Sequence, residues 1–369
     1  MKVLQVYKDY YPPVMGGIER HVNLLATGLR DRGIDVRVLV SNTRPVYEEA
    51  VVEGIRVIKA PQLFRLSSAP VNPGMTALLR RLGRDSDILH FHLPNPTADL
   101  AYLYSGLCGP KVIATYHSDI VRQKLLKTVY RPFFRRFLNK CHAIVTTSPH
   151  YLKSSADLCA YADKCHVVPL GINFARFDDR PGAETISAIR RRYGPHIVLF
   201  IGKFRYYKGL DVLLRAMENV DARLLMIGSG PYEARLKQLA AGSAAAGRIF
   251  FMGELADREV ESFLKASDIF VLPSIFRSEA FGLAQLEAMA CGKPVISTEL
   301  GTGTSYVNQH GETGMVVPPG DHRALARSIH ALLADPELRR QYGEAARRRA
   351  RACFSDRQMI EKTLKIYKN

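Results

Sequence analysis

Short runs of apolar and β-branched residues alternate with longer amphipathic stretches along the chain. In the first half these runs predict strands at 3–7, 35–40, 55–60, 88–92, 111–116 and 143–147, with helices at 18–32 and 120–140. A second series predicts strands at 196–202, 223–228, 249–252, 269–272, 294–297 and 314–317, again separated by helical patterns. Strands that alternate with helices form parallel sheets covered on both faces. The pattern therefore predicts an α/β protein with two Rossmann-like, doubly wound domains.

The two series separate where a strand-like segment runs into proline and glycine at 167–173. We therefore expect an N-terminal domain over 1–172 and a C-terminal domain over 173–352, facing each other across a cleft. The tail from residue 324 onward is helical in pattern and rich in arginine. We expect Pro132 to kink or split the helix at 120–140, because proline has no backbone N–H.

The charge balance narrows the choice of partner. The 369 residues include 52 basic and 35 acidic ones, a formal net charge of +17. Such an excess of positive charge indicates a polyanionic binding partner, which could be nucleic acid, anionic lipid or a phosphorylated substrate. No apolar run is long enough to span a bilayer, and the first residues lack a secretory signal pattern. The six cysteines form no C-x-x-C pair, which predicts free thiols in a reducing cytosol and no zinc site.

Glycines and cations follow predicted strands at two places. Gly16 and Gly17 lie between the first strand and the first helix, where backbone N–H groups can approach a phosphate. The segment Gly-Lys-Phe-Arg-Tyr-Tyr-Lys-Gly places Lys203, Arg205 and Lys208 in a strand-to-helix loop, a setting that suits a diphosphate. A tight turn and a solvated loop are the plain alternatives. The dinucleotide fingerprint G-x-G-x-x-G is absent, which disfavours a nicotinamide dehydrogenase.

Two carboxylates eight positions apart are the most informative feature. Glu279 precedes a predicted helix, and Glu287 lies two turns further along. Carboxylates accept hydrogen bonds from vicinal hydroxyls, so Glu279 could hold a sugar and Glu287 a ribose. The free N–H groups at the helix start belong to Phe281, Gly282 and Leu283 and can point into the cleft. The alternative is a helix cap followed by a surface glutamate.

Together these segments resemble the GT-B retaining glycosyltransferases of family 4, over essentially the whole chain. The resemblance rests on Gly16-Gly17-Ile18-Glu19, His117 after a strand, the Lys203–Lys208 loop, Gly228-Ser229-Gly230-Pro231, the Glu279/Glu287 pair and Gly292-Lys293-Pro294-Val295-Ile296. It implies an acceptor-binding N-terminal domain and a nucleotide-sugar-binding C-terminal domain. It also implies that a C-terminal helix at 353–369 packs back toward the N-terminal domain.

The resemblance implies a catalytic role for three residues. Lys208 binds the donor diphosphate, Glu279 contacts hydroxyls of the transferred sugar, and His117 lines the sugar site. The proline that usually follows the first glutamate is Ala280 here. The family implies retention of the anomeric configuration without a metal or another cofactor. Cations and helix dipoles then stabilise the leaving diphosphate.

The remaining donor-binding residues follow from the same resemblance. Gly16 and Gly17 bring amides near the diphosphate, and Glu287 contacts the ribose. Lys203 occupies a position where the family usually has arginine. Because lysine cannot make the bidentate contacts of arginine, we expect Arg205 to share the binding of the diphosphate. The amides of Phe281, Gly282 and Leu283 face the donor, and the base lies near Gly253 and Leu255.

A closer resemblance points to bacterial rhamnosyl- and mannosyltransferases of O-polysaccharide assembly. It rests on Tyr7-Lys8-x-Tyr10-x-Pro12 and on the segments 117–123 and 300–308. It implies transfer of a hexose or deoxyhexose, mannose or rhamnose, from a nucleotide diphosphate sugar, with GDP favoured. The acceptor it implies is a saccharide on polyprenyl diphosphate.

A basic stretch fits such a lipid-linked acceptor. Between 122 and 140 no acidic residue interrupts Arg122, Lys124, Lys127, Arg131, Arg135, Arg136 and Lys140. Aromatic and aliphatic residues interleave with them, and a basic amphipathic helix can lie on an anionic membrane surface. This predicts a cytoplasmic protein at the inner face of the cytoplasmic membrane. The alternative is an ordinary helix with one core face and one solvated face.

Three other functions remain open from the sequence. One is a UDP-sugar-dependent glycosyltransferase of the same fold, and another is a GT-B sugar-nucleotide epimerase that needs no acceptor. The third is a basic nucleic-acid-binding protein. No recognised nucleic-acid-binding module is present, so we expect no nucleic-acid partner.

Overall fold

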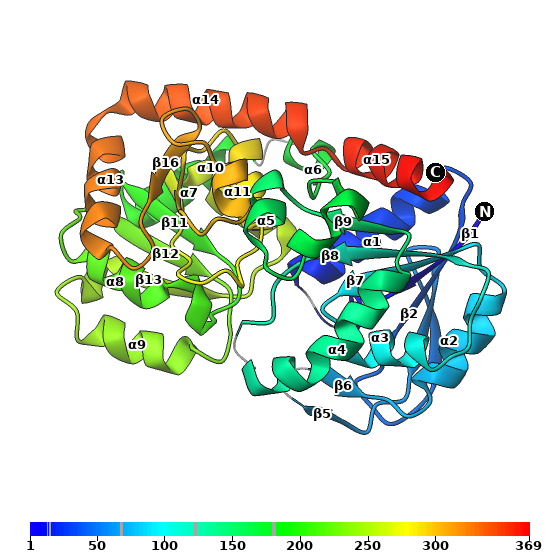
Figure 1. Ribbon diagram of the computed structural model, residues 1–369. Coiled ribbons are helices and arrows are strands. Elements are labelled where there is room, and N and C mark those ends of the chain that lie inside the picture. Colours follow the sequence, from blue (N-terminus) through cyan, green and yellow to red (C-terminus); the bar gives the residue numbers. More distant parts are fainter. Residues whose placement is uncertain (13, 15, 67–68, 122–123, 179–181) are drawn as a thin grey trace. The chain divides into compact units, whose positions relative to one another are not determined.

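The computed structural model describes residues 1–12, 14, 16–66, 69–121, 124–178 and 182–369. The described chain divides into two compact units, one of residues 1–171 with 356–369 and one of residues 172–355. Each unit contains one large sheet with helices on both faces (Figure 1). The predicted α/β class with two Rossmann-like halves is confirmed.

The first unit is built on an eight-stranded sheet. Its strands are β1 (Lys2–Val6), β2 (Asp35–Ser41), β3 (Glu48–Val52), β4 (Ile55–Ala60), β7 (Ile88–Leu93), β8 (Lys111–Tyr116), β9 (Ala143–Thr146) and β10 (Cys165–Val167). Their order is β10-β9-β8-β7-β1-β2-β4-β3, and every neighbouring pair is parallel except β3 and β4. Two further strands, β5 (Phe64–Leu66) and β6 (Ala69–Val71), form a separate antiparallel pair.

Helices cover both faces of this sheet. They are α1 (Gly17–Arg30), α2 (Met75–Arg84), α3 (Pro96–Leu103), α4 (Lys124–Lys140), α5 (Pro149–Ser154), the 3-10 helix η1 (Cys159–Lys164) and α15 (Asp356–Lys368). The C-terminal helix α15 packs beside α1 (Figure 1), where Met359, Ile360 and Ile366 join the core of the first unit. The last helix of the chain thus completes the fold of its first unit, as the predicted fold requires.

Helix α4 differs from its prediction in two respects. It starts at Lys124 rather than at residue 120, and residues 122–123 lie outside the described part of the chain. It also continues through Pro132, so of the two expected outcomes, a kink or a split, the split does not occur. Both sides of the proline are anchored in the core. Tyr130 donates a hydrogen bond to Asp99 before it, and Phe134 and Phe137 are buried after it.

The second unit is built on six parallel strands. These are β11 (Ile197–Ile201), β12 (Arg223–Ile227), β13 (Ile249–Gly253), β14 (Ile269–Leu272), β15 (Val295–Thr298) and β16 (Gly314–Val317), in the order β13-β12-β11-β14-β15-β16. Its helices are α6 (Ala175–Asp178), α7 (Ala183–Tyr193), η2 (Tyr206–Lys208), α8 (Leu210–Met217), α9 (Glu233–Ala241), η3 (Ala246–Arg248), α10 (Asp257–Ala266), α11 (Leu283–Ala290), α12 (Gly303–Val307), α13 (His322–Ala334) and α14 (Pro336–Cys353). Within the described residues, every helix is too short or too polar to span a lipid bilayer.

Each sheet has a point where the direction of winding reverses. In the first unit it lies between β1 and β7, and in the second between β11 and β14. Ligands of doubly wound folds bind in the crevice at the carboxyl ends of such strands. The loops after β11 and β14 are the ones that carry Lys208 and Glu279.

Candidate active site

A buried ion pair marks the switch point of the second sheet. Lys208 ends η2 after β11, and Glu279 lies in the loop between β14 and α11. The Nζ atom of Lys208 is 2.5 Å from Oε2 of Glu279, and the two residues are 9% and 7% exposed. Burial lowers the pKa of Lys208, but the Glu279 carboxylate more than offsets this and raises it above its usual value. Lys208 therefore stays cationic although it is buried.

Two loops fix the position of Glu279. The Ser274 hydroxyl donates to Glu279 Oε2 at 2.9 Å, and the Thr302 hydroxyl donates to the Glu279 carbonyl at 2.8 Å. The N–H of Gly303 donates to the Ala280 carbonyl at 2.7 Å. Sequence reasoning did not identify Ser274 or Thr302 as site residues. Their signal is weak, because each is only a small polar residue that closely follows a strand.

The start of α11 is shaped by Gly282. This residue has φ of +78°, and a Cβ atom there would lie 2.5 Å from the Leu272 side chain. Phe281 is buried, and its carbonyl accepts a hydrogen bond of 2.6 Å from Gln285. The side chain of Phe281 thus belongs to the core, and its backbone opens the helix. Glu287 is half-buried on the same helix.

The cationic loop after β11 is held by close backbone contacts with the loop after β12. The N–H of Phe204 donates to the Ser229 carbonyl at 2.8 Å. A Cβ on Gly230 would lie 2.5 Å from the Phe204 carbonyl oxygen, so only glycine fits this approach. The buried Phe204 separates Lys203, which is half-buried, from Arg205, which is exposed.

The predicted base-binding residues lie at the same edge of the second sheet. Gly253 ends β13 with φ of +70°, and Leu255 follows in a partly exposed loop. Between them, Glu254 accepts a hydrogen bond of 2.6 Å from the Ser229 hydroxyl. Because the strands are parallel, these residues share the edge that carries Lys208, Glu279 and the start of α11.

The remaining predicted site residues belong to the first unit. Gly16 precedes α1 and Gly17 begins it. A Cβ on Gly16 would lie 2.2 Å from a carboxylate oxygen of Glu19. His117 directly follows β8 and is buried, with Nε2 3.0 Å from Nδ1 of His92.

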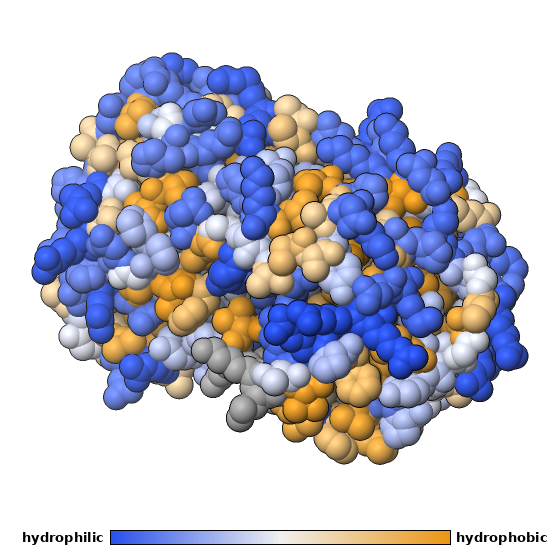
Figure 2. All heavy atoms as spheres, in the orientation of Figure 1, coloured by the Kyte–Doolittle hydropathy of each residue, from blue (hydrophilic) through white to orange (hydrophobic). Residues whose placement is uncertain are grey.

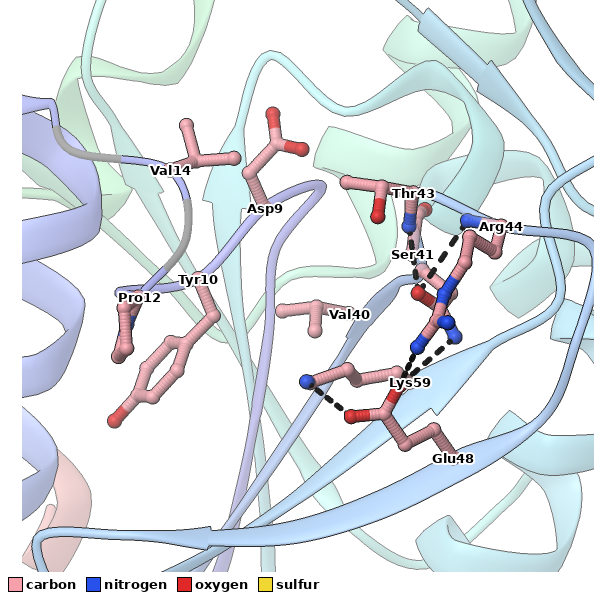
Figure 3. A pocket seen from close by; sticks show the side chains of 11 residues that line it. Asp9, Tyr10, Pro12, Val14, Val40, Ser41, Thr43, Arg44, Glu48 and Lys59 are labelled. Carbon is pink, nitrogen blue, oxygen red and sulfur yellow. Dashed lines mark hydrogen bonds and ion pairs between the residues drawn. The ribbon is translucent and has the colours of Figure 1, made fainter.

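A small polar pocket opens in the first unit beside the end of β2. It has a volume of about 120 Å³ and is lined by Asp9, Tyr10, Pro12, Val14, Val40, Ser41, Asn42, Thr43, Arg44, Glu48 and Lys59. Figure 3 shows Arg44 and Lys59 turned toward Glu48, with Nζ of Lys59 2.6 Å from Glu48 Oε1. The opposite side of the pocket carries Asp9, which pairs with Arg65. Ordered hydroxyls, carboxylates and cations of this kind can bind a saccharide.

Helix α4 presents both cations and apolar side chains to solvent. Arg131, Arg135 and Arg136 are exposed, as are Leu126 and Val129. Figure 2 shows strongly hydrophilic atoms beside hydrophobic ones in the region where Figure 1 places α4. Of the other predicted cations, Lys127 pairs with Asp157 at 2.6 Å, which reduces its availability. Arg122 and the side chain of Lys124 lie outside the described residues.

Metal-binding potential is low around the Lys208–Glu279 pair. Within the described ranges, histidine, cysteine and carboxylate side chains close enough to share a metal ion form one group, and it lies in the first unit. What the second unit offers instead is a buried cation, a helix N-terminus and two carboxylates on loops and helices that meet at one sheet edge. This set can bind an anion next to a group with several hydroxyls.

Both halves of the chain match models of enzyme families. A model described as glycosyl transferases group 1 matches residues 183–349, and one described as glycosyltransferase family 4 matches residues 15–176.

Known sequences and solved structures are similar over nearly the full length. The chain is 36% identical over 367 residues to O-antigen chain mannosyltransferase C of Escherichia coli, which spans 100% of this chain and 98% of that protein. It is 37% identical over 358 residues to D-rhamnosyltransferase WbpZ of Pseudomonas aeruginosa, covering 96% of this chain and 92% of that protein. Its fold is similar to that of a sucrose-phosphate synthase from Thermosynechococcus elongatus, with a TM-score of 0.82, 23% identity, and coverage of 100% and 98%. Anabaena HepE in complex with UDP and glucose gives a TM-score of 0.81 at 18% identity, covering 99% of each chain.

Proposed function

The chain belongs to the group 1 and family 4 glycosyltransferases, and on this premise we propose that it transfers mannose or rhamnose from a GDP-sugar to a lipid-linked saccharide. Its function is glycosyl transfer in O-polysaccharide biosynthesis, from a nucleotide-sugar donor to a glycan acceptor. The sugar, the base and the lipid are the proposed parts. Names of two relatives, a mannosyltransferase and a D-rhamnosyltransferase, support the choice of sugar.

The main support for placing the donor site here is the buried Lys208–Glu279 pair at the switch point of the second sheet. In the proposal, the donor diphosphate lies against Lys208, with Lys203 and Arg205 as further cations. The backbone N–H groups at the start of α11 face the same anion, because a helix N-terminus carries partial positive charge.

The two carboxylates take the hydroxyl-bearing parts of the donor. Glu279 binds hydroxyls of the transferred sugar, and Glu287 binds the ribose. The base lies at the end of β13, beside Gly253 and Leu255. We assign the sugar to Glu279 because this residue pairs with Lys208, the cation proposed to bind the diphosphate. Glu287 lies further along α11 and is therefore assigned to the ribose.

The proposed reaction retains the anomeric configuration. The bond between the sugar carbon and the diphosphate oxygen breaks, and a bond to the acceptor hydroxyl oxygen forms on the same face. The hydroxyl proton passes to an oxygen of the departing diphosphate. Lys208 stabilises the negative charge that develops on that diphosphate. Electrostatic stabilisation by a fixed group of this kind is usually the largest single contribution to catalysis.

The acceptor is assigned to the first unit. The pocket between Asp9 and Glu48 offers hydrogen-bonding groups for a saccharide, and Gly16, Gly17 and His117 lie at the carboxyl edge of the same sheet. The exposed cations and apolar side chains of α4 support peripheral binding at an anionic membrane, where a polyprenyl diphosphate would be found.

A donor panel tests this function. The purified protein is incubated with GDP-mannose, GDP-rhamnose, UDP-glucose or UDP-N-acetylglucosamine, with and without polyprenyl-diphosphate-linked N-acetylglucosamine, and nucleotide release and product mass are followed. We expect GDP release that depends on acceptor, with one hexose or deoxyhexose added to the product. UDP release would overturn the GDP assignment. Release without acceptor, with conversion of the donor sugar, would identify an epimerase instead.

A further inference from the structure

His117, directly after β8, is tied to the neighbouring strand β7 through its backbone and through its ring. Its N–H donates to the Leu93 carbonyl at 3.0 Å. Its ring nitrogen Nε2 lies 3.0 Å from Nδ1 of His92, and a hydrogen bond joins the two rings. His117 is 3% exposed, and His92 is fully buried within β7. The orientation of the His117 ring thus depends on His92.

This hydrogen bond leaves one particular nitrogen of His117 for a ligand. Burial, with a further contribution from neighbouring imidazoles, lowers the pKa of both His92 and His117, so each ring is neutral at about pH 7. In a neutral imidazole one nitrogen donates and the other accepts. Among the described residues, the buried Nδ1 of His117 has no hydrogen-bond partner. A buried polar atom without a partner is costly, so Nδ1 is the atom that a bound hydroxyl would satisfy.

Two further rings pack edge-on against the His92–His117 pair. The ring of His21, on α1, has its centroid 5.1 Å from that of His117 and 5.7 Å from that of His92. The ring of Tyr7, just after β1, lies 6.1 Å from His92 and 6.5 Å from His117. The two paired rings are themselves nearly parallel, with an angle of 17° between their planes. Close packing on these sides restrains both rings.

His90 fixes the remaining neighbour of His92. It stacks on His92 with ring centroids 4.5 Å apart. Its Nδ1 lies 2.6 Å from the hydroxyl of Tyr367, on α15, and its Nε2 lies 2.6 Å from the Thr115 hydroxyl. Because both nitrogens of His90 have partners, its ring cannot turn without losing a hydrogen bond. His92 is therefore held between a fixed ring and His117.

We propose that His92 is a positioning residue for the glycosyl transfer. Its hydrogen bond to Nε2 holds the His117 ring in one orientation, in which Nδ1 is presented to a saccharide hydroxyl. When His92 donates to Nε2, the Nδ1–H of His117 donates to the hydroxyl oxygen, and in the opposite tautomer Nδ1 accepts from the hydroxyl. The inference rests on the proposed function, which assigns saccharide binding to the first unit.

Three substitutions of His92 separate positioning from packing. His92→Leu keeps a similar volume but removes both nitrogens. His92→Asn is smaller, but its amide branches from Cγ as Nδ1 does, so it can still form a hydrogen bond with His117. His92→Gln is closer to histidine in volume, but its amide lies one atom further out, where histidine has Nε2. In the wild type that nitrogen makes no described hydrogen bond.

The order of the three turnover numbers tests the proposal. We expect kcat to fall by about 10-fold or more in His92→Leu and His92→Gln, and by about 3-fold or less in His92→Asn, because only asparagine restores the hydrogen bond. Affinity for the free nucleotide should stay at the wild-type value in all three. A packing role predicts the opposite order, because asparagine leaves the largest cavity. His330→Asn, at an exposed position on α13, is the control and should turn over as wild type.

The hydrogen bond is also observed without any substrate. In protein labelled with ¹⁵N-histidine, an imidazole proton protected from exchange with water should be present in the wild type and absent in His92→Leu. If His92→Leu fails to fold, His92→Gln carries both measurements. Absence of the protected proton in the wild type, or an equal loss of turnover in the glutamine and asparagine variants, would overturn the positioning role alone. Absence of wild-type turnover with every donor of the panel would overturn the proposed function and this role together.

Discussion

Lys208 and Glu279 form an ion pair in a buried part of the second unit. Taking two charges out of water is costly, and their mutual attraction repays this only while both are present. The Ser274 hydroxyl adds one hydrogen bond to the carboxylate but cannot replace the cation. The ion pair therefore contributes both to the stability of the loops after β11 and β14 and to the proposed binding of the donor.

This coupling predicts the effect of removing one charge. Lys208→Met leaves the Glu279 carboxylate buried without its cation, and we expect a loss of about 3–5 kcal/mol of unfolding free energy. Adding Glu279→Gln to that variant should recover a large part of the loss. Denaturant unfolding of the two single variants and the double variant measures this. Simple additivity of the single effects would argue against a mutually stabilising pair.

Lys293 gives a pH-dependent prediction. Burial lowers the pKa of Lys293 to about 8, and its Nζ donates to the Lys265 carbonyl at 2.8 Å. Between that pKa and the higher one of the unfolded chain, only the unfolded chain binds the proton, so this residue makes stability rise with pH. Below about pH 8 Lys293 is protonated in the folded protein, and the whole free-energy cost of burying its charge then lowers the stability.

The corresponding variant is Lys293→Met. The difference in unfolding free energy between this variant and the wild type should favour the variant more at pH 7 than at pH 10, by about 1–2 kcal/mol. Unfolding by urea at both pH values measures the difference. Lys237→Met, at an exposed position on α9, is the control and should show no such change. An equal effect of Lys293→Met at both pH values would contradict the lowered pKa.

At the scale of elements, α12 supports the loop that carries Glu279 through its first residue, Gly303. A Cβ on Gly303 would lie 2.6 Å from the Phe281 ring and 2.7 Å from the Ala280 carbonyl oxygen. The ring and the carbonyl oxygen both belong to the loop that carries Glu279. A side chain at position 303 must therefore displace that loop.

Gly303→Ala should accordingly impair both stability and turnover. We expect a loss of about 1–3 kcal/mol from overpacking, and a fall in kcat of about 10-fold or more from misplacement of Glu279. Thermal unfolding and initial rates measure the two effects. Gly247→Ala is the matched control, because a Cβ there meets no atom within 4 Å. Wild-type turnover in Gly303→Ala would show that the loop does not depend on α12.

Helix α4 carries the membrane prediction. Its exposed cations and apolar side chains should bind vesicles of phosphatidylglycerol but not of phosphatidylcholine, with an affinity that falls as salt rises. Reversing three charges should abolish binding, in the variant Arg131→Glu, Arg135→Glu, Arg136→Glu. The control makes the same charge change at exposed arginines of the second unit, Arg258, Arg323 and Arg348. Equal loss of binding in both variants would point to net charge rather than to α4.

Most elements could be predicted from the sequence, because the strands of covered parallel sheets are continuous apolar runs. Every predicted strand is present, with ends that agree or differ by one residue. The missed strands, β3, β5, β6 and β10, are short or partly exposed and lack such a run. Pro132 does not split α4, because tertiary contacts on both sides outweigh one lost hydrogen bond.

At the scale of the whole molecule, contacts between distant segments were the least predictable. The resemblance singled out Lys208 and Glu279 individually, but not their ion pair, which depends on β11 and β14 being neighbours in the sheet. The grouping of His21, His92 and His117 has no sequence signal, because the three come from different elements. His92 reads simply as part of a strand.

The central claim for the molecule is that its second unit holds the donor sugar through Glu279. The most direct measurement is the turnover of Glu279→Gln with the preferred donor and acceptor, together with its affinity for the free nucleotide. We expect turnover to fall by about 100-fold or more while nucleotide affinity changes little, because in the proposed site the carboxylate contacts the sugar and not the nucleotide. Glu344→Gln, at an exposed position on α14, should behave as wild type. Wild-type turnover in Glu279→Gln would contradict the assignment of the site.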